Sequence, residues 1–231
     1  MTIKKVAILQ SNYIPWKGYF DIINSVDEFV IYDDVQFTKN DWRNRNQIMT
    51  PQGKSWLTVP VKHQTGQLIY EVEVSDPEWQ SKHWERLKQN YSKAPFFKDF
   101  REPFESFYRG EKIHNLSLAN LKLISAVNIT LGISTNISDS RQYRRDLAPS
   151  ERLLTILKSL GGTEYLSGPA AKSYLDESIF IEEGIKVSFM NYENYPTYSQ
   201  LSQEFAHDVT ILDVLFNCGP EARAQLKSFT L

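Results

Sequence analysis

Short apolar runs recur along the chain between amphipathic segments, a pattern typical of strands that alternate with helices. Near the N-terminus, the run at residues 4–9 predicts a buried strand, and residues 15–26 predict a helix that Pro15 opens in its first turn. The run at residues 28–35 predicts a second strand that is covered on both faces. A strand, a helix and a strand in this order form a βαβ unit, so the sequence predicts a parallel sheet.

The middle of the chain has a different pattern. Two β-rich runs within residues 45–61 flank a turn that contains a proline and a glycine, which predicts an antiparallel hairpin. The alternating run at residues 68–74 is expected to join this hairpin as a third strand. The pattern from residue 75 to residue 133 is mainly helical, and strands and helices alternate again after it.

This order of elements predicts a single α/β domain over residues 1–231. We expect a Rossmann-like fold with a mostly parallel sheet and helices on both of its faces. The hairpin and the helices around residues 45–130 are expected to form an insertion in this domain. No internal repeat, low-complexity tract or linker divides the chain, which is long enough to bury a full core.

Charge and cysteine content narrow the classes of function. The net charge is −2 and the isoelectric point is about 6.1, which argues against broad binding of nucleic acid or anionic membranes. A single cysteine, Cys218, excludes an intrachain disulfide and a CxxC zinc site. The N-terminal apolar run is too short for a signal peptide, and no later stretch approaches the length of a membrane span. We therefore expect a cytoplasmic protein.

Candidate ligand-binding side chains follow the first predicted strand. Ligands of open α/β sheets collect at the carboxyl ends of the parallel strands. Amide and aromatic side chains gather there in this sequence: Gln10, Asn12, Tyr13, Trp16 and Tyr19. The amides could recognise hydroxyl groups, the rings offer flat faces, and the helix start behind them favours an anion. The alternative is that this segment only shapes a strand-to-helix turn.

A second candidate group follows the second strand. Asp33 and Asp34 end that strand, so one carboxylate is expected to point into the site while the other caps or faces the sheet. A carboxylate there could bind an amine, a sugar hydroxyl or Mg²⁺. Arg43, Asn44 and Arg45 could bind phosphate or carboxylate groups. The alternative is a structural ion-pair network in which Asp34, Arg43 and Arg45 hold the hairpin.

Two further segments carry candidate chemistry. His83 lies on a predicted helix, where it is either a general base or a structural residue. Ser167 and Gly168 follow a predicted strand, and Lys172 lies on the next helix, so the three could hold a phosphate. The four histidines lack metal-binding spacing, and adjacent aspartates on a strand point to opposite faces. We therefore predict no tightly held metal, with any Mg²⁺ accompanying a nucleotide.

Several of these motifs together resemble the WbqC-like protein family. They occur in this order and extend over nearly the whole chain, at residues 10–23, 32–48, 56–61, 165–176 and 210–219. Members of that family occur with bacterial O-antigen and related surface-polysaccharide biosynthesis. The resemblance implies a cytoplasmic protein that acts on a sugar precursor, such as a nucleotide-linked amino sugar. It leaves open a homodimer or an association with other enzymes of the pathway.

The residues and the resemblance together lead to one main hypothesis. We expect a transferase that attaches an amino-acid or acyl group to a nucleotide-linked amino sugar. Asp33 or Asp34 would be its base, with His83 as the other candidate, and Arg43, Arg45 and Lys172 would hold phosphates or a carboxylate. A nucleotide or an activated acyl donor would be the other small molecule. The alternatives are a non-catalytic nucleotide-sugar-binding or scaffold protein and a nucleotidyltransferase-like enzyme.

Overall fold

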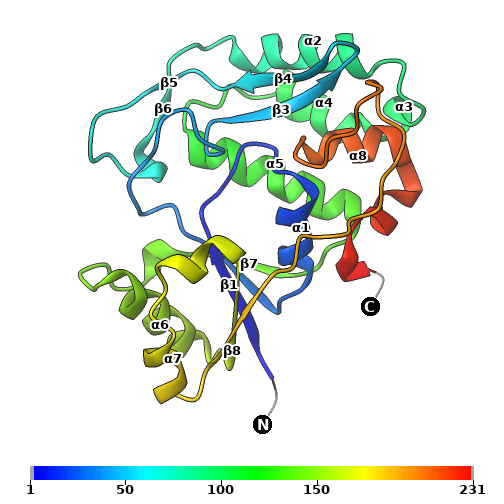
Figure 1. Ribbon diagram of the computed structural model, residues 1–231. Coiled ribbons are helices and arrows are strands. Elements are labelled where there is room, and N and C mark those ends of the chain that lie inside the picture. Colours follow the sequence, from blue (N-terminus) through cyan, green and yellow to red (C-terminus); the bar gives the residue numbers. More distant parts are fainter. Residues whose placement is uncertain (1–2, 230–231) are drawn as a thin grey trace.

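The centre of the molecule is a five-stranded parallel sheet, as the sequence predicts. The computed structural model describes residues 3–229. The strands follow the order β7-β2-β1-β8-β9 across the sheet, of which Figure 1 labels β7, β1 and β8. Their bounds are Lys5–Leu9 for β1, Glu28–Ile31 for β2, Asn136–Asp139 for β7, Glu164–Ser167 for β8 and Lys186–Phe189 for β9. β1 pairs in parallel with β2 on one side and with β8 on the other, so it is the central strand.

Helices cover both faces of this sheet, which confirms the predicted fold class. Val6 and Ile8 of β1 pack in a core that contains residues of α6 (Pro149–Leu160) and α7 (Ser178–Glu182). Ala7, between them in sequence, packs in a separate core with residues of α1 (Lys17–Asn24) and α5 (Leu116–Leu131). Successive side chains of a strand point to opposite faces of the sheet, so a strand that is covered on both faces is apolar at consecutive positions.

The two long covering helices begin and end where their local sequence requires. The side chain of Asn115 accepts a hydrogen bond from the backbone N–H of Leu118 at the start of α5. Pro149 opens α6, where its missing N–H costs nothing. Gly132 and Gly161 follow the two helices with φ of 68° and 66°, the left-handed conformation that ends many helices.

The chain between β2 and β7 forms a hairpin and a group of helices. β3 (Arg45–Thr50) and β4 (Gly53–Thr58) pair as the predicted antiparallel hairpin. The expectation that residues 68–74 join this hairpin is wrong, because β6 (Glu73–Val74) pairs with β5 (Val61–Lys62) in a separate sheet. The preceding turn, η1 (Ile69–Glu71), buries Ile69 and Val72. These residues follow the three-residue period of a 3-10 turn and not the two-residue period of a strand.

Three inserted helices and the C-terminal elements pack together beside the sheet. The inserted helices are α2 (Trp79–Tyr91), α3 (Phe97–Phe100) and α4 (Glu102–Arg109). α8 (Ile211–Cys218) packs against α3, and η4 (Gly219–Gln225) and η5 (Lys227–Phe229) follow it. At the start of α8, the N–H of Thr210 donates to Gln47 and the N–H of Ile211 donates to Pro15. The C-terminal helix is thereby joined both to the hairpin and to the loop after β1.

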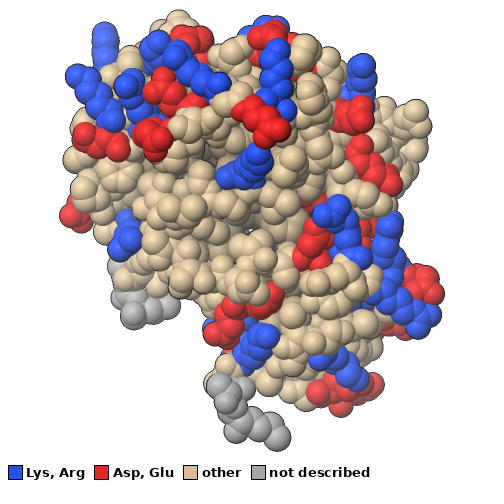
Figure 2. Space-filling view, turned by 180° about the vertical axis from the view of Figure 1, so that it is seen from behind, with Lys and Arg blue, Asp and Glu red and all other residues tan. Residues whose placement is uncertain are grey.

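Charged groups of both signs lie mixed on the surface. Figure 2 shows one face, on which basic and acidic side chains lie close together around a broad uncharged centre. This mixing agrees with the small net charge of the chain. Among residues 3–229, no helix has the length and apolar character needed to cross a membrane.

Candidate functional site

A crevice lies where the connections of the sheet change direction. From β1 the chain continues to β2 and β7 on one side of β1, and it then returns to β8 and β9 on the other side. The loops after β1 and β8 therefore leave the sheet in different directions, which creates the usual ligand site of an open α/β sheet. A cavity of about 360 Å³ lies there, and its lining includes Gln10, Asn12, Tyr32, Arg43, Ser167, Gly168 and Tyr174.

The guanidinium of Arg43 is the cationic group of this crevice. It forms an ion pair with Asp41 at 2.9 Å and donates a hydrogen bond to the side-chain oxygen of Gln10. Asn120 of α5 donates to the backbone oxygen of Arg43 at 2.9 Å and to the hydroxyl of Ser11 at 3.0 Å. A guanidinium held on two sides is suited to an anionic ligand, because little side-chain freedom remains to be lost on binding.

The loop after β1 is held in a strained conformation. Ile14 has a φ of +35°, which is a rare backbone angle for a β-branched residue. The side-chain nitrogen of Asn46 donates to the backbone oxygens of Tyr13 and Ile14, at 3.1 and 2.7 Å. The N–H of Tyr13 donates to the oxygen of Trp42 at 2.9 Å. Such strain costs roughly 1–3 kcal/mol and is concentrated at functional sites, so it indicates a loop shaped for a ligand.

A second, smaller cavity adjoins this loop. It measures about 180 Å³ and is lined by Asn12, Pro15, Trp16, Trp42, Asn46 and Asp208. Asn12 lines both cavities. Its side-chain oxygen is buried and has no hydrogen-bond partner among the residues that the structure describes. A buried amide oxygen without a partner is an unused acceptor between the two cavities.

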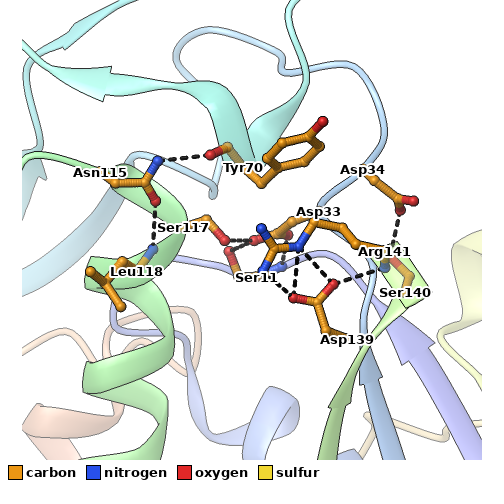
Figure 3. Close-up of polar contacts among 10 residues, drawn as sticks. All are labelled: Ser11, Asp33, Asp34, Tyr70, Asn115, Ser117, Leu118, Asp139, Ser140 and Arg141. Atoms are coloured by element: carbon orange, nitrogen blue, oxygen red, sulfur yellow. Dashed lines mark hydrogen bonds and ion pairs between the residues drawn. The ribbon is translucent and has the colours of Figure 1, made fainter.

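Asp33 is buried among neutral hydrogen-bond donors (Figure 3). It accepts hydrogen bonds from the N–H of Ser11 at 2.8 Å and from the hydroxyl of Ser11 at 2.7 Å. The hydroxyl of Ser117 on α5 also donates to it. Burial raises the pKa of Asp33, and these hydrogen bonds oppose that rise. Asp33 therefore holds the loop after β1 against α5.

Asp34 is buried on the opposite side of the strand end and has charged partners. It pairs with Arg152 of α6, which is also buried, and its carboxylate lies 3.7 Å from Arg145. The hydroxyl of Ser140 in η2 (Ser140–Gln142) donates to it as well (Figure 3). The alternative of an ion-pair network that joins Asp34 to Arg43 and Arg45 is not what the structure has, because the arginines that reach Asp34 come from the loop before α6 and from α6 itself.

The two aspartates therefore do not divide their roles as expected. Both side chains are buried in hydrogen-bonded networks, and neither lines the crevice or the smaller cavity. The expectation that one of the two carboxylates points into the ligand site is therefore wrong. A catalytic role for either residue stays a prediction.

His83 lies in a buried chain of hydrogen bonds. Its Nε2 is 3.1 Å from the carbonyl oxygen of Thr58, which can only accept, so Nε2 carries the proton. Its Nδ1 must then accept from the hydroxyl of Tyr13 at 2.7 Å, and that hydroxyl is 2.6 Å from Tyr108. Burial lowers the pKa of His83 to about 4. Both ring nitrogens are used within the protein, so the geometry favours a structural role over that of a general base.

Some of the other predicted residues line the two cavities, whereas others are buried in the core. Gln10, Asn12, Arg43, Ser167 and Gly168 meet in the crevice, and Trp16 lines the smaller cavity. The rings of Tyr13 and Tyr19 are buried in the core, which corrects the expectation that they offer flat faces to a ligand.

The remaining three predicted residues point elsewhere. Asn44 is buried and donates to the backbone oxygen of Val59 at 3.0 Å. The guanidinium of Arg45 lies 4.0 Å from the centre of the Trp56 ring. Lys172 is in η3 (Pro169–Ser173), a 3-10 turn, with its ammonium 5.1 Å from the centre of the Phe189 ring. None of the three lines the crevice, so a phosphate contact from Lys172 stays a prediction.

Four residues of interest were missed by sequence reasoning. Tyr32 and Tyr174 line the crevice, and Asn120 holds two of its segments in place. The position of Tyr32 directly after β2 was a usable signal, because strand ends converge on the site. Lys17 is only 1% exposed, donates to the oxygen of Pro196 at 2.9 Å, and lies 5.0 Å from the centre of the Tyr195 ring. Burial lowers the pKa of Lys17 to about 8.

The fold and the crevice define a class: a parallel α/β protein with a cationic, amide-lined ligand site at the switch point of its sheet. The chain belongs to the WbqC-like protein family, which matches residues 10–225. It is 47% identical over 227 residues to the uncharacterized protein Rv1507c of Mycobacterium tuberculosis, and the matched region covers 97% of this chain and 98% of that protein. No solved structure is significantly similar to this chain. Within residues 3–229, no three or more His, Cys, Asp or Glu side chains gather as a metal site.

Proposed function

We propose that this protein is a cytoplasmic enzyme of bacterial surface-polysaccharide (O-antigen) biosynthesis that acts on a nucleotide-linked amino sugar. The reaction is transfer of an amino-acid or acyl group to the sugar amine. The amine nitrogen forms the new amide bond to the acyl carbon, the bond from that carbon to the leaving group of the activated donor breaks, and the departing group carries away the proton that the amine loses. The single observation that carries the proposal is the crevice at the switch point of the sheet, with Arg43 held at its wall.

The chemistry of the crevice matches a nucleotide. The fork of Arg43 would bind the diphosphate, with Mg²⁺ accompanying the nucleotide. The amides of Gln10 and Asn12 would bind hydroxyl groups. Tyr174 is 69% exposed and borders the crevice, so its ring offers a face for the base. Asp33 acts through Ser11 and His83 acts through Tyr13, and both are positioning residues of the loop after β1.

Calorimetric titration of nucleotides tests this assignment. UDP, GDP, CDP and dTDP, each alone and as a sugar conjugate, are titrated into the wild type, Arg43→Ala and Arg45→Ala. A hydrogen bond to a charged group contributes about 1.5–3 kcal/mol, so Arg43→Ala is expected to weaken binding roughly 10- to 150-fold. For the nucleotides without a sugar, Arg45→Ala is the matched control, because that guanidinium lies over Trp56 and outside the crevice. Absence of binding by every nucleotide would overturn the proposal.

A non-catalytic nucleotide-sugar-binding or scaffold protein of the same pathway is the second candidate. It is favoured by the structural contacts of Asp33, Asp34 and His83, which leave none of these groups at the crevice wall. The two candidates differ in turnover. An enzyme converts a bound amino-sugar nucleotide when an activated acyl donor is added, and mass spectrometry detects the acylated sugar. A scaffold binds the nucleotide sugar and leaves it unchanged, while it associates with other enzymes of the pathway.

A further inference from the structure

We propose that the tryptophan-lined cavity beside the crevice is the subsite for the sugar ring of the ligand. The inference rests on the proposed function, since it places the nucleotide in the crevice and the sugar next to it. Asn12 joins the two cavities, because it lines both. A nucleotide sugar consists of two such parts of unequal size, and the two cavities measure about 360 and 180 Å³.

The size of the smaller cavity suits a single ring. Its volume of about 180 Å³ is half that of the crevice, about 360 Å³. The smaller cavity therefore suits the smaller of the two parts of a nucleotide sugar, the sugar ring. The walls contributed by Pro15, Trp16 and Trp42 are apolar, and the polar groups of Asn12, Asn46 and Asp208 are interspersed among them. Apolar walls with a few polar groups are the usual lining of small-molecule sites.

The apolar wall includes an exposed aromatic platform. Trp42 is 39% exposed, and its ring centre lies 5.6 Å from that of Trp56, which is 38% exposed. The guanidinium of Arg45 covers Trp56 at 4.0 Å. Trp42 is therefore in contact with Trp56, at an angle of 42° between the rings, and is partly exposed. A large, partly exposed ring of this kind suits the C–H face of a sugar, whose burial removes apolar surface from water.

The polar groups suit a ring that carries hydrogen-bond donors. The buried side-chain oxygen of Asn12 can accept from a hydroxyl or an amine, and a buried acceptor without a partner is unfavourable. Asp208 also lines this cavity, and its exposed carboxylate pairs with Lys54 at 2.7 Å. An acceptor and a carboxylate favour an amino sugar over a fully hydroxylated one, because the carboxylate attracts an ammonium group.

The experiment compares a nucleotide with the corresponding nucleotide sugar. UDP and UDP-glucosamine, or the pair that binds the wild type, are titrated into the wild type, Trp42→Ala, Trp42→Phe and the surface control Ile129→Ala. An aromatic contact contributes about 0.5–1.5 kcal/mol, so Trp42→Ala is expected to weaken the nucleotide sugar roughly two- to twelvefold. Binding of the nucleotide alone stays within twofold. Trp42→Phe keeps an aromatic face and retains most of the affinity.

Four outcomes would count against the subsite. Equal weakening of nucleotide and nucleotide sugar by Trp42→Ala, or no weakening of either, overturns the subsite while the proposed function stands. Acetyl-coenzyme A, as an activated acyl donor, is titrated into the same proteins. If Trp42→Ala weakens its binding and leaves the nucleotide sugar unaffected, the assignment of the ring is overturned and the donor belongs there instead. Failure of the wild type to bind any nucleotide overturns the proposed function itself. If Trp42→Ala does not fold, Trp42→Phe still tests the proposal, because nucleotide-sugar quenching of tryptophan fluorescence should decrease in that variant.

Discussion

Asp33 and Asp34 are adjacent in sequence and equally buried, but the protein accommodates their carboxylates in different ways. Neutral donors from Ser11 and Ser117 surround Asp33. Asp34 pairs with the buried guanidinium of Arg152. Because successive residues at a strand end face opposite sides, Asp33 reaches Ser117 of α5 (Figure 3), whereas Asp34 reaches Arg152 of α6.

The difference shows what each carboxylate does for the crevice. Asp33 holds Ser11, whose neighbours in sequence line the crevice, so it shapes the loop that meets the ligand. Asp34 holds α6, whose first residue, Pro149, lines the crevice from the other side. Hydrogen bonds from neutral donors have directional geometry that positions a loop, whereas a buried ion pair is sensitive to the loss of either partner.

The largest expected effect comes from breaking the Asp34–Arg152 pair. Asp34→Ala leaves the guanidinium of Arg152 buried without its carboxylate, which costs roughly 3–5 kcal/mol. The double variant Asp34→Leu/Arg152→Met removes both charges and is expected to recover most of that loss. Urea unfolding measures the stability of the single and the double variant. Asp146→Ala, which breaks an exposed pair with Arg144, is the control and should stay close to the wild type. A double variant as unstable as the single one would contradict the comparison.

His83 extends the comparison to a buried group with only neutral partners. Its pKa is about 4 in the folded protein and about 6.5 in the unfolded chain. Between these values the unfolded chain binds the extra proton, so stability rises with pH. The stability that neutral His83 contributes is complete above pH 6.5 and is lost as the pH falls toward 4. A pKa shift of this size corresponds to roughly 3 kcal/mol in the free energy of unfolding.

The free energy of unfolding, measured from pH 4 to pH 7.5, tests this expectation. The wild type should lose stability relative to His83→Gln as the pH falls, because glutamine has no proton to gain. Parallel profiles for the two proteins would show that His83 is not the group responsible.

The smallest effect concerns the hydroxyls around Asp33. Ser117→Ala removes one donor but leaves both bonds from Ser11 in place, so a loss of about 1.5 kcal/mol is expected. Ser106→Ala is a matched control, because that exposed hydroxyl donates to Glu102 at the surface. Thermal unfolding compares the two. A loss as large as that of Asp34→Ala would remove the distinction between the two carboxylates.

The parts of the site that follow from local pattern could be predicted from the sequence. Gln10, Asn12, Ser167 and Gly168 lie at or shortly after the carboxyl ends of parallel strands, and the rule for open α/β sheets places such residues together. The hairpin was also predictable, because its turn residues lie between two β-rich runs. These inferences need only the order of elements and the geometry of a parallel sheet.

The partners of the buried polar groups could not be predicted in this way. Ser117 is 84 residues from Asp33, and Arg152 is 118 residues from Asp34. Sequence spacing says nothing about which helix brings a donor to a strand end. The same limit applies to Tyr13, because its burial depends on α2 and α4, which supply His83 and Tyr108. Local pattern identifies polar residues near strand ends, but tertiary packing decides whether they face a ligand or the protein.

The pairing of β1 with β8 has a consequence for synthesis on the ribosome. Lys5 pairs with Glu164, so the two strands emerge from the ribosome far apart in time. At about 5–20 residues per second, that interval is roughly 8–30 s. During this interval β1 can pair with β2, but its other edge has no strand beside it, and unpaired edges promote association between chains. The crevice is built on that edge, so it is incomplete in a nascent chain until β8 and Tyr174 have been made.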